Sequence, residues 1–223
     1  MNILTKTADG SNTLFNQSVG EHYHSAHGAV QESNHVFVNA GFDHFAINNQ
    51  HDISILEVGF GTGLNFLLTS AHAQKINRKF SYTGIEAFPL PLNIITKTEY
   101  DQYVDGNVWK TFIAHYEPAL ADEQALSALC QLSIIHTQLQ DFSTDRKFDI
   151  IYFDAFSVRH QPEMWTDEII QRVCGLLKTG GIFVTYAITG NLKRAVKSAG
   201  LTIEKLPGAP GKREMLRATK SVT

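Results

Sequence analysis

The sequence predicts a doubly wound, Rossmann-like α/β fold, in which helices cover both faces of a mostly parallel sheet. Strand-like and helix-like segments alternate from residue 53 onward, and the strand-like segments are almost continuously apolar. A glycine-rich turn follows the first of these segments, as in other folds of this class. We therefore expect one domain over residues 51–223, with a small N-terminal extension over residues 1–50 packed on it.

The first half of the chain changes from irregular to regular patterning near residue 50. Residues 1–50 are polar with scattered aromatic side chains, which predicts irregular structure or a small hairpin. After them we expect a strand at 53–58, a helix at 63–75, a strand at 80–85, a turn at 89–91 and a helical section at 92–129.

The second half continues the alternation and brings the number of expected strands to seven. We expect strands at 132–136, 148–153, 182–187, 201–205 and 214–219, with helices at 164–177 and 190–198. Thr166, followed by Asp167 and Glu168, suits the start of the first helix, because acids favour the positive end of a helix dipole. Gly200 is a typical C-terminal stop for the second helix.

Composition and charge are those of an ordinary globular protein. No apolar run is long enough to span a bilayer, the N-terminus lacks an export signal, and the only cysteines are Cys130 and Cys174. We therefore expect a cytoplasmic protein that does not enter a membrane. Residues 193–220 hold eight basic and two acidic residues, a local charge of +6 in a chain of net charge −3, so this end could bind a polyanion or be a solvated surface.

The glycine turn Glu57-Val58-Gly59-Phe60-Gly61-Thr62-Gly63 indicates the kind of ligand. A phosphate-binding P-loop needs Gly-Lys-Ser/Thr, whereas Leu64 and Asn65 follow the last glycine here. A dinucleotide fingerprint would place a glycine at position 64 and no acid two residues before the loop. The acid instead favours a cationic ligand without phosphate, such as S-adenosylmethionine, with a nicotinamide cofactor as the weaker alternative.

Two further acids end predicted strands on the same edge of the sheet. Glu86 is placed to accept hydrogen bonds from ribose hydroxyls, although it could also be a surface acid. Asp154 would face the glycine turn across the cleft and could orient an acceptor amine, accept its proton and stabilise the cationic product. Because a carboxylate of ordinary pKa is a weak base, we expect orientation and electrostatics to dominate, unless Asp154 merely caps its turn.

The remaining candidates are aromatic, basic and histidine residues in loops. Trp165 could stack on a base and Arg159 could contact a phosphate, but Trp165 suits core packing equally well. The basic turn at 208–213 could grip phosphates. His22, His24 and His27 lack cysteine or acidic partners in the sequence, so we predict surface or substrate contacts and no metal site.

Four segments resemble the methyltransferase part of the MnmC family in the same order along the chain. They are GFGTGLNF at 59–66, IEAFPL at 85–90, FDAFSVRHQPEMWT at 153–166 and GKREML at 211–216, and HSAHGAVQESNHVF at 24–37 is loosely similar to the opening of that family. The resemblance covers nearly the whole chain and implies a class I methyltransferase fold. It also implies the stand-alone, MnmD-like form, without the flavin-dependent oxidase domain of the family.

The resemblance implies methylation of the exocyclic amine of 5-aminomethyl-2-thiouridine, or 5-aminomethyluridine, at the tRNA wobble position. S-adenosylmethionine would be the donor, tRNA would bind through its anticodon region, and upstream tRNA-modifying enzymes would supply the aminomethyl group. Two positions depart from the family pattern: Gln138 stands where an acid usually contacts adenine, and Val158 replaces a common proline. Gln138 can still hydrogen-bond adenine through its amide.

The expected site residues follow from these arguments together. Asp154 is the expected catalytic residue, and the expected cofactor contacts are Glu57, Gly59, Phe60, Gly61, Thr62, Gly63, Asn65, Glu86, Gln138, Leu139 and Asp154. Expected substrate contacts are Phe156, Arg159, Trp165, Lys212 and Arg213. The alternatives are a small-molecule amine methyltransferase or aminopropyltransferase-like enzyme, and a non-catalytic module that binds tRNA or senses the cofactor.

Overall fold

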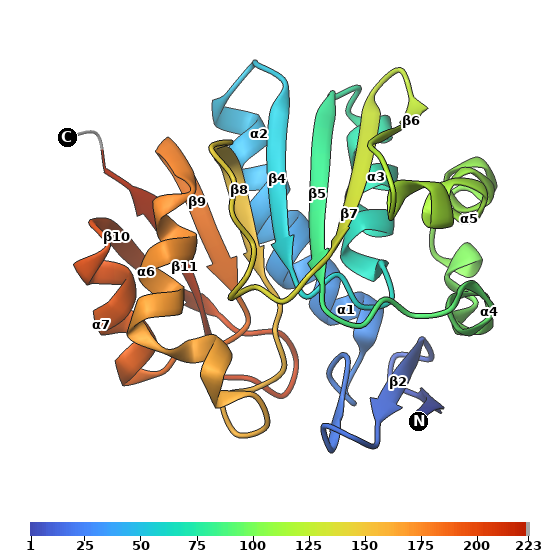
Figure 1. Ribbon diagram of the computed structural model, residues 1–223, viewed down its shortest axis with the longest axis horizontal. Helices are drawn as coiled ribbons and strands as arrows, with labels where there is room; N and C mark the ends of the chain where they lie inside the picture. The colour runs from blue at the N-terminus through green and yellow to red at the C-terminus, as the bar shows by residue number, and fades with distance from the viewer. Residues whose placement is uncertain (222–223) are drawn as a thin grey trace.

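The computed structural model describes residues 1–221 and is built on a central sheet of eight strands in the order β10-β11-β9-β8-β4-β5-β7-β6 (Figure 1). Neighbouring strands from β9 through β7 are parallel, whereas β6, β11 and β10 pair antiparallel at the two edges. The strands are β4 (Ile53–Val58), β5 (Phe80–Glu86), β6 (Gln124–Ser127), β7 (Cys130–His136), β8 (Phe148–Phe153), β9 (Leu177–Thr185), β10 (Leu201–Pro207) and β11 (Glu214–Lys220). The predicted doubly wound α/β fold is confirmed.

The eighth strand was not expected, because β6 lies inside the section predicted to be helical. β6 has four residues, half of them exposed, and forms a hairpin with β7 through two turn residues. So short and polar an edge strand has too few alternating apolar residues to be distinguished from a loop. The rest of that section contains α4 (Leu92–Ile95), η2 (Thr96–Thr98), η3 (Tyr100–Gln102) and α5 (Gly106–Ala119).

The other predicted helices are present, α7 (Gly190–Ser198) with the predicted ends and the others with shifted ends. Those others are α3 (Leu64–Lys75), η4 (Pro162–Trp165) and α6 (Asp167–Gly175). β9 begins five residues before the predicted strand, because the register shifts between Phe148 and Ile150 of β8 and the strand continues through Gly180-Gly181. These glycines therefore lie in a bulge within the strand instead of a turn before it.

The first fifty residues contain more structure than the sequence predicts. β1 (Asn2–Lys6), β2 (Asn12–Asn16) and β3 (Glu21–His22) form a small antiparallel sheet, so the predicted hairpin is present. A continuous helix follows, made of α1 (Ala29–Ser33), the π-helical η1 (Asn34–Asp43) and α2 (His44–Asn48). Its weak helix formers, including Gly41, gave no helical signal, and packing on the sheet stabilises it instead. Gly41 permits this contact, because a Cβ there would lie 2.8 Å from the Tyr152 ring.

Two hydrophobic clusters pack against opposite faces of the sheet. Neighbouring residues of β4 show the division, since Ile55 belongs to one cluster and Leu56 to the other, and both are fully buried. The helix at 29–48 and α3 cover one face, and α6 with α7 cover the other (Figure 1). Among residues 1–221 no helix is both long and apolar enough to cross a membrane.

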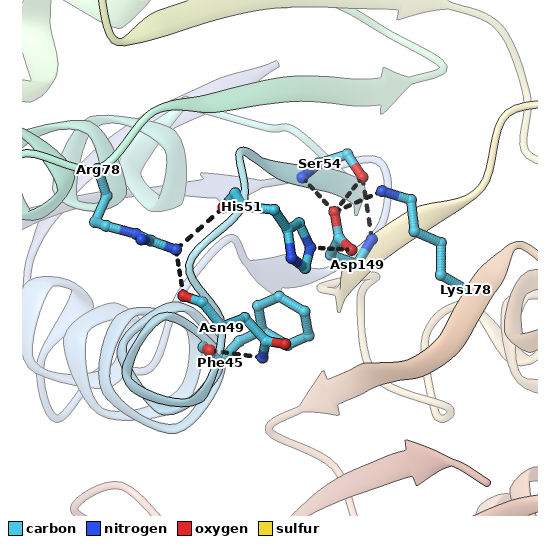
Figure 2. A network of polar contacts seen from close by, with 7 residues as sticks. All are labelled: Phe45, Asn49, His51, Ser54, Arg78, Asp149 and Lys178. Carbon is cyan, nitrogen blue, oxygen red and sulfur yellow. Dashed lines mark hydrogen bonds and ion pairs between the residues drawn. The ribbon is translucent and has the colours of Figure 1, made fainter. Parts of the chain in front are cut away.

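A buried carboxylate joins the strands at the amino edge of the sheet (Figure 2). Asp149, at the start of β8, accepts hydrogen bonds from the Ser54 amide at 2.8 Å and the Ser54 hydroxyl at 2.7 Å. It also accepts from Lys178 Nζ at 2.8 Å and lies 3.0 Å from His51 Nε2. Burial alone would raise the pKa of Asp149, but the hydrogen bonds from Lys178 and Ser54 outweigh it and the pKa is lowered.

Asp149→Asn is expected to reduce the free energy of unfolding at pH 7 by about 1.5–3 kcal/mol, the range for hydrogen bonds to a charged group. Because the folded-state pKa is lowered, the carboxylate stabilises the fold above its unfolded pKa of about 3.9 and loses this effect as the pH falls. The difference in free energy of unfolding between the parent and the Asp149→Asn variant should therefore decrease below pH 4. Urea unfolding across pH checks this, with Asp52→Asn as a control that removes only an exposed pair with Lys79.

Candidate active site

A cavity of about 540 Å³ opens at the carboxyl edge of β4, β5 and β8, a size suited to a small-molecule ligand. It is lined mainly by the glycine turn after β4, the ends of β5 and β7, the loop after β8, and residues 19–26 of the N-terminal segment. The small N-terminal sheet lies beside this edge (Figure 1). The predicted position at the ends of the strands is therefore where the structure places the cavity.

The glycine turn is held in a backbone conformation that favours glycine. Gly59, Gly61 and Gly63 have φ angles of 85°, 54° and 77°. A Cβ on Gly59 would lie 2.5 Å from the carbonyl oxygen of Asp154, so the turn is in backbone contact with the loop after β8. Phe60 and Thr62 of the same turn also line the cavity.

Gly59→Ala is expected to destabilise the fold by about 1–3 kcal/mol more than a positive-φ glycine substitution elsewhere, because it adds a clash to the backbone cost. Gly200→Ala is the matched control, since Gly200 has a φ of 81° and open space where the Cβ would go. Chemical denaturation measures the difference, and calorimetry should show weakened cofactor binding in the Gly59 variant alone. Equal losses in both variants would contradict the contact with Asp154.

Glu86 is fixed by backbone donors from two loops. Its Oε2 accepts from the Gly61 amide at 2.8 Å, and its Oε1 accepts from the Phe88 amide at 2.9 Å. Its carboxylate is thus held at the cavity wall with lone pairs left for a ligand. Leu139, which is buried, and Gln138, which is exposed, lie on the same wall after β7.

Asn65 links the acid before the glycine turn to the acid after β8. Its Nδ2 donates to Glu57 Oε1 at 2.8 Å and to Asp154 Oδ2 at 2.7 Å, while its Oδ1 accepts from the Ser33 hydroxyl. Glu57 is fully buried and is not part of the cavity wall, so it bears on a ligand only through Asn65. Its second oxygen has no well-formed hydrogen bond among residues 1–221, although the Tyr82 hydroxyl lies beside it.

Both acids bridged by Asn65 resist ionisation. Burial, followed by the charge of Asp154, raises the pKa of Glu57 well above its usual range. Burial and the charge of Glu32 raise the pKa of Asp154 to about 7, against the opposing effects of Asn65 and Lys212. Asp154 therefore does not have the ordinary carboxylate pKa expected from the sequence, and a group with a pKa near 7 accepts a proton effectively at neutral pH.

A third group of side chains, absent from the sequence-based expectation except for Lys212, completes the cavity beside Asp154. Glu32 of α1 is 6% exposed, accepts from the Ser25 amide at 2.8 Å and forms an ion pair with Lys212. The Lys212 ammonium also lies 3.7 Å from the centroid of the Tyr186 ring, a cation–π contact. Lys212 is therefore at the cavity wall, as an internal ion pair.

The remaining predicted substrate residues divide into three groups. Phe156 lines the cavity and packs edge-on against Tyr23. Arg159 and Arg213 are exposed and lie outside the cavity wall. Trp165 is 6% exposed, donates from Nε1 to the Phe156 carbonyl at 2.8 Å and packs on core aromatic rings. The prediction that Trp165 stacks on a substrate base is therefore wrong, because its faces are already covered.

The N-terminal histidines have separate partners. The ring of His22 packs on Phe15, and His24 Nδ1 lies 3.0 Å from the Thr13 hydroxyl. Burial lowers the pKa of His24 to about 4, so its imidazole is neutral at pH 7. In the described part of the chain, no three His, Cys, Asp or Glu side chains are grouped so as to hold a metal ion.

The charge of the cavity wall fits S-adenosylmethionine, which carries ammonium and sulfonium groups and no phosphate. Five carboxylates line the cavity against the single ammonium of Lys212: Glu21, Glu32, Glu86, Asp154 and Glu163. A pyrophosphate would be repelled from such a wall, whereas a cationic ligand is attracted.

Two further residues of this site, Tyr186 and Glu32, are absent from the sequence-based expectation. Tyr186 directly follows β9, and the rule that functional residues follow strand ends could have identified it. Glu32 lies in a segment with no recognisable helical pattern, so nothing in the sequence places it beside Asp154.

A family model described as S-adenosyl-L-methionine-dependent methyltransferase matches residues 105–221. Curated relatives called "tRNA 5-methylaminomethyl-2-thiouridine biosynthesis bifunctional protein MnmC" come from Leptospira borgpetersenii and Campylobacter hominis. The first is 29% identical over 204 residues, covering 87% of this chain and 31% of the relative. The second is 29% identical over 210 residues, covering 92% and 31%. The chain thus spans about a third of the length of these relatives.

Solved structures agree on the fold. MnmC2 from Aquifex aeolicus aligns over all of this chain and 72% of its own, with a TM-score of 0.79 and 22% identity. DesVI from Streptomyces venezuelae aligns over 86% of this chain and 92% of its own, with a TM-score of 0.51 and 12% identity. The resemblance to the methyltransferase part of MnmC is confirmed, and the chain belongs to the family of S-adenosyl-L-methionine-dependent methyltransferases.

Proposed function

We propose that this methyltransferase acts on the exocyclic amine of 5-aminomethyl-2-thiouridine, or 5-aminomethyluridine, at the wobble position of tRNA. The observation that carries the proposal is Asp154, a carboxylate of pKa about 7 in an acid-lined cavity opposite the glycine turn. An amine acceptor suits such a wall, because both the substrate amine as it binds and the methylated product carry a positive charge. The names of the curated relatives support the choice of the modified uridine.

In this proposal, Asp154 prepares the acceptor amine. The ammonium of the substrate must lose a proton before its nitrogen lone pair can form a bond to carbon, and Asp154 accepts that proton. When bound, S-adenosylmethionine supplies the electrophilic methyl group. The Glu32 carboxylate then stabilises the positive charge that develops on the methylated nitrogen, and Asp154 does so as well once it has released its proton to solvent. Asn65 keeps Asp154 oriented, because it donates to the oxygen Oδ2.

The cofactor contacts in this proposal follow the cavity wall. Gly59 and Gly61 allow the backbone to approach the ligand, and Glu86 accepts from the ribose hydroxyls. Gly63 lies outside the cavity wall, because a Cβ there would meet the Phe112 ring at 2.8 Å, so its predicted contact with the cofactor is not part of this proposal. Gln138 and Leu139 contact the adenine. Glu57 contributes through Asn65 and not by direct contact.

The substrate tRNA would enter with its anticodon region at the cavity, beside Phe156. Upstream enzymes that attach the aminomethyl group to uridine would supply the substrate, and the reaction would take place in the cytoplasm. The second activity implied by the word "bifunctional" in the names of the relatives is outside this proposal, since the chain matches only about a third of their length.

Nucleoside mass spectrometry tests the proposal directly. Hypomodified tRNA carrying the aminomethyl group is incubated with the protein and S-adenosylmethionine labelled in the methyl group, and its nucleosides are analysed. We expect the label in the methylaminomethyl nucleoside, and none in tRNA whose wobble uridine is unmodified. Transfer of the methyl label to a free polyamine and not to tRNA would instead support a small-molecule amine methyltransferase, and transfer of an aminopropyl group would support an aminopropyltransferase-like enzyme. Cofactor binding without any transfer would support a non-catalytic module.

A further inference from the structure

A second hollow, which we call the α7–β10 groove, lies between helix α7 and edge strand β10. It has a volume of about 390 Å³ and is lined by Gly190, Lys193, Arg194, Lys197, Ile203 and Lys205. Four of these six residues carry a positive charge, and none carries a negative one. The only acid of β10, Glu204, points to the other face of the strand, where it pairs with Arg217 at 2.7 Å.

The cations of this groove have no ionic partners in the part of the chain that the structure describes. Arg194 donates only to the Asn191 amide oxygen, and no ion pair involves the other three. Three other basic residues of the 193–220 segment are used inside the fold: Lys212 pairs with Glu32, Arg217 with Glu204, and Lys220 donates to the Leu177 carbonyl. Of the five that remain, four line the groove.

The packing of α7 on the core does not require this cluster of positive charges. The buried residues of α7 are Leu192, Ala195 and Val196, so the core fixes the register of the helix. Lys197 is then one helical turn from both Lys193 and Arg194, and like charges at such spacing destabilise a helix. An anion bound in the groove would offset this repulsion.

The groove is also close to the candidate active site along the chain. Gly190 is four residues after Tyr186, which lines the cavity, so their Cα atoms are within about 15 Å even if the chain between them is fully extended. The other wall, β10, ends at Pro207 and leads into the turn that carries Lys212 to the cavity. A ligand that fills the cavity and extends along this edge of the molecule therefore reaches the groove.

We propose that the α7–β10 groove binds the sugar–phosphate backbone of the tRNA, at nucleotides outside the one that enters the cavity. This inference rests on the proposed function for the identity of the polyanion. Charges spread over a helical turn and an adjacent strand suit a chain of phosphates more than a single one. The groove has no aromatic side chain to stack on a base, so its contacts position the RNA and do not read its sequence.

The test compares two triple variants of equal charge change. The groove variant combines Lys193→Ala, Arg194→Ala and Lys197→Ala. The control variant combines Lys75→Ala, Lys97→Ala and Lys110→Ala, three exposed lysines that line neither the groove nor the cavity. Thermal unfolding and calorimetric binding of S-adenosylmethionine establish that both variants are folded and retain the cofactor site.

We expect the groove variant to bind tRNA at least about tenfold more weakly at moderate salt, whereas the control changes less than threefold. The slope of log Kd against log salt should decrease by about two to three in the groove variant, since each phosphate contact contributes about 0.7–0.9. In methyl-transfer assays the groove variant should have a higher KM for tRNA and a kcat within about twofold of the parent. The reason is that the contact positions the RNA and does not touch the reacting atoms.

Several outcomes would overturn the groove proposal. Equal weakening in the two triple variants would indicate general electrostatics, and an unchanged salt slope would exclude phosphate contacts in the groove. Competition by inorganic phosphate alone, at concentrations that leave ionic strength unchanged, would indicate a single-anion site. Binding is measured separately from transfer, so the two proposals can fail independently. Groove-dependent tRNA binding without methyl transfer would refute only the proposed function, and methyl transfer with intact binding in the groove variant would refute only the groove.

Discussion

Asp154→Asn is expected to lower the rate of methyl transfer at least about a hundredfold, the lower end of the range for losing a general base. An amide cannot accept the proton of the acceptor, but its oxygen can still accept the hydrogen bond from Asn65. The Kd for S-adenosylmethionine should therefore change only a few-fold. Single-turnover transfer to hypomodified tRNA and calorimetry with the cofactor alone measure the two effects separately.

The same variant has a second signature in its pH dependence. The parent should show kcat/KM rising with pH through an inflection near 7, as Asp154 loses its proton, and the Asn variant should lack this inflection. Because the folded-state pKa is raised above the unfolded value, ionised Asp154 reduces stability as the pH rises from about 4 to 7. Asp154→Asn should thus melt higher than the parent at pH 8 and equally below pH 4. A parent-like pH profile in the variant would exclude Asp154 as the base.

Asn65→Leu is expected to cause the largest loss of stability, about 3–5 kcal/mol at pH 8, comparable to removing one partner from a buried ionic network. Leucine has a similar volume but cannot donate to Glu57 or Asp154, so the buried Glu57 carboxylate and the half-buried Asp154 carboxylate would lose the donor that bridges them. Their pKa values would rise further, and the loss should be smaller at pH 5, where both can bind protons.

Thr69→Val is the matched control for Asn65. Thr69 lies on the same helix, is fully buried and makes one contact of 3.3 Å with the Tyr152 hydroxyl, which carries no charge. Its replacement should cost about 1 kcal/mol at most pH values, as for a neutral hydrogen bond. Urea unfolding of both variants at pH 5 and pH 8 gives the comparison. A loss in Asn65→Leu that does not depend on pH would show that packing, and not the carboxylates, requires the asparagine.

The parts of the site that the sequence predicts are those fixed by the rules of parallel sheets. Glu86 and Asp154 each follow a buried apolar run, and the carboxyl ends of parallel strands meet at one edge. The glycine turn was recognisable because left-handed backbone conformations require glycine at several positions. The fold class and most elements of residues 53–221, apart from β6, were predictable because apolar strand-like segments alternate with helix-like ones.

The parts that the sequence did not predict depend on tertiary contacts. The 29–48 helix has poor intrinsic propensity and forms only against the sheet. The position of Glu32 at the cavity could therefore not be predicted from the sequence. Lys212, in a basic turn within a family-like segment, and Trp165, an aromatic residue in a loop, were both predicted to contact RNA. Their partners, Glu32 for one and the Phe156 carbonyl for the other, are distant in sequence or unremarkable in type, and only the folded structure shows that both side chains are already used.

The ion pair of Lys212 with Glu32 has a consequence for how an amine would bind. In the free protein an ammonium of the chain itself already lies beside Asp154, against the Tyr186 ring. An acceptor ammonium entering this position would exchange one cation for another, so the charge of the cavity would stay nearly constant through the binding step. Affinity would then depend on competition with a tethered lysine, and the site would favour acceptors that offer more than a positive charge.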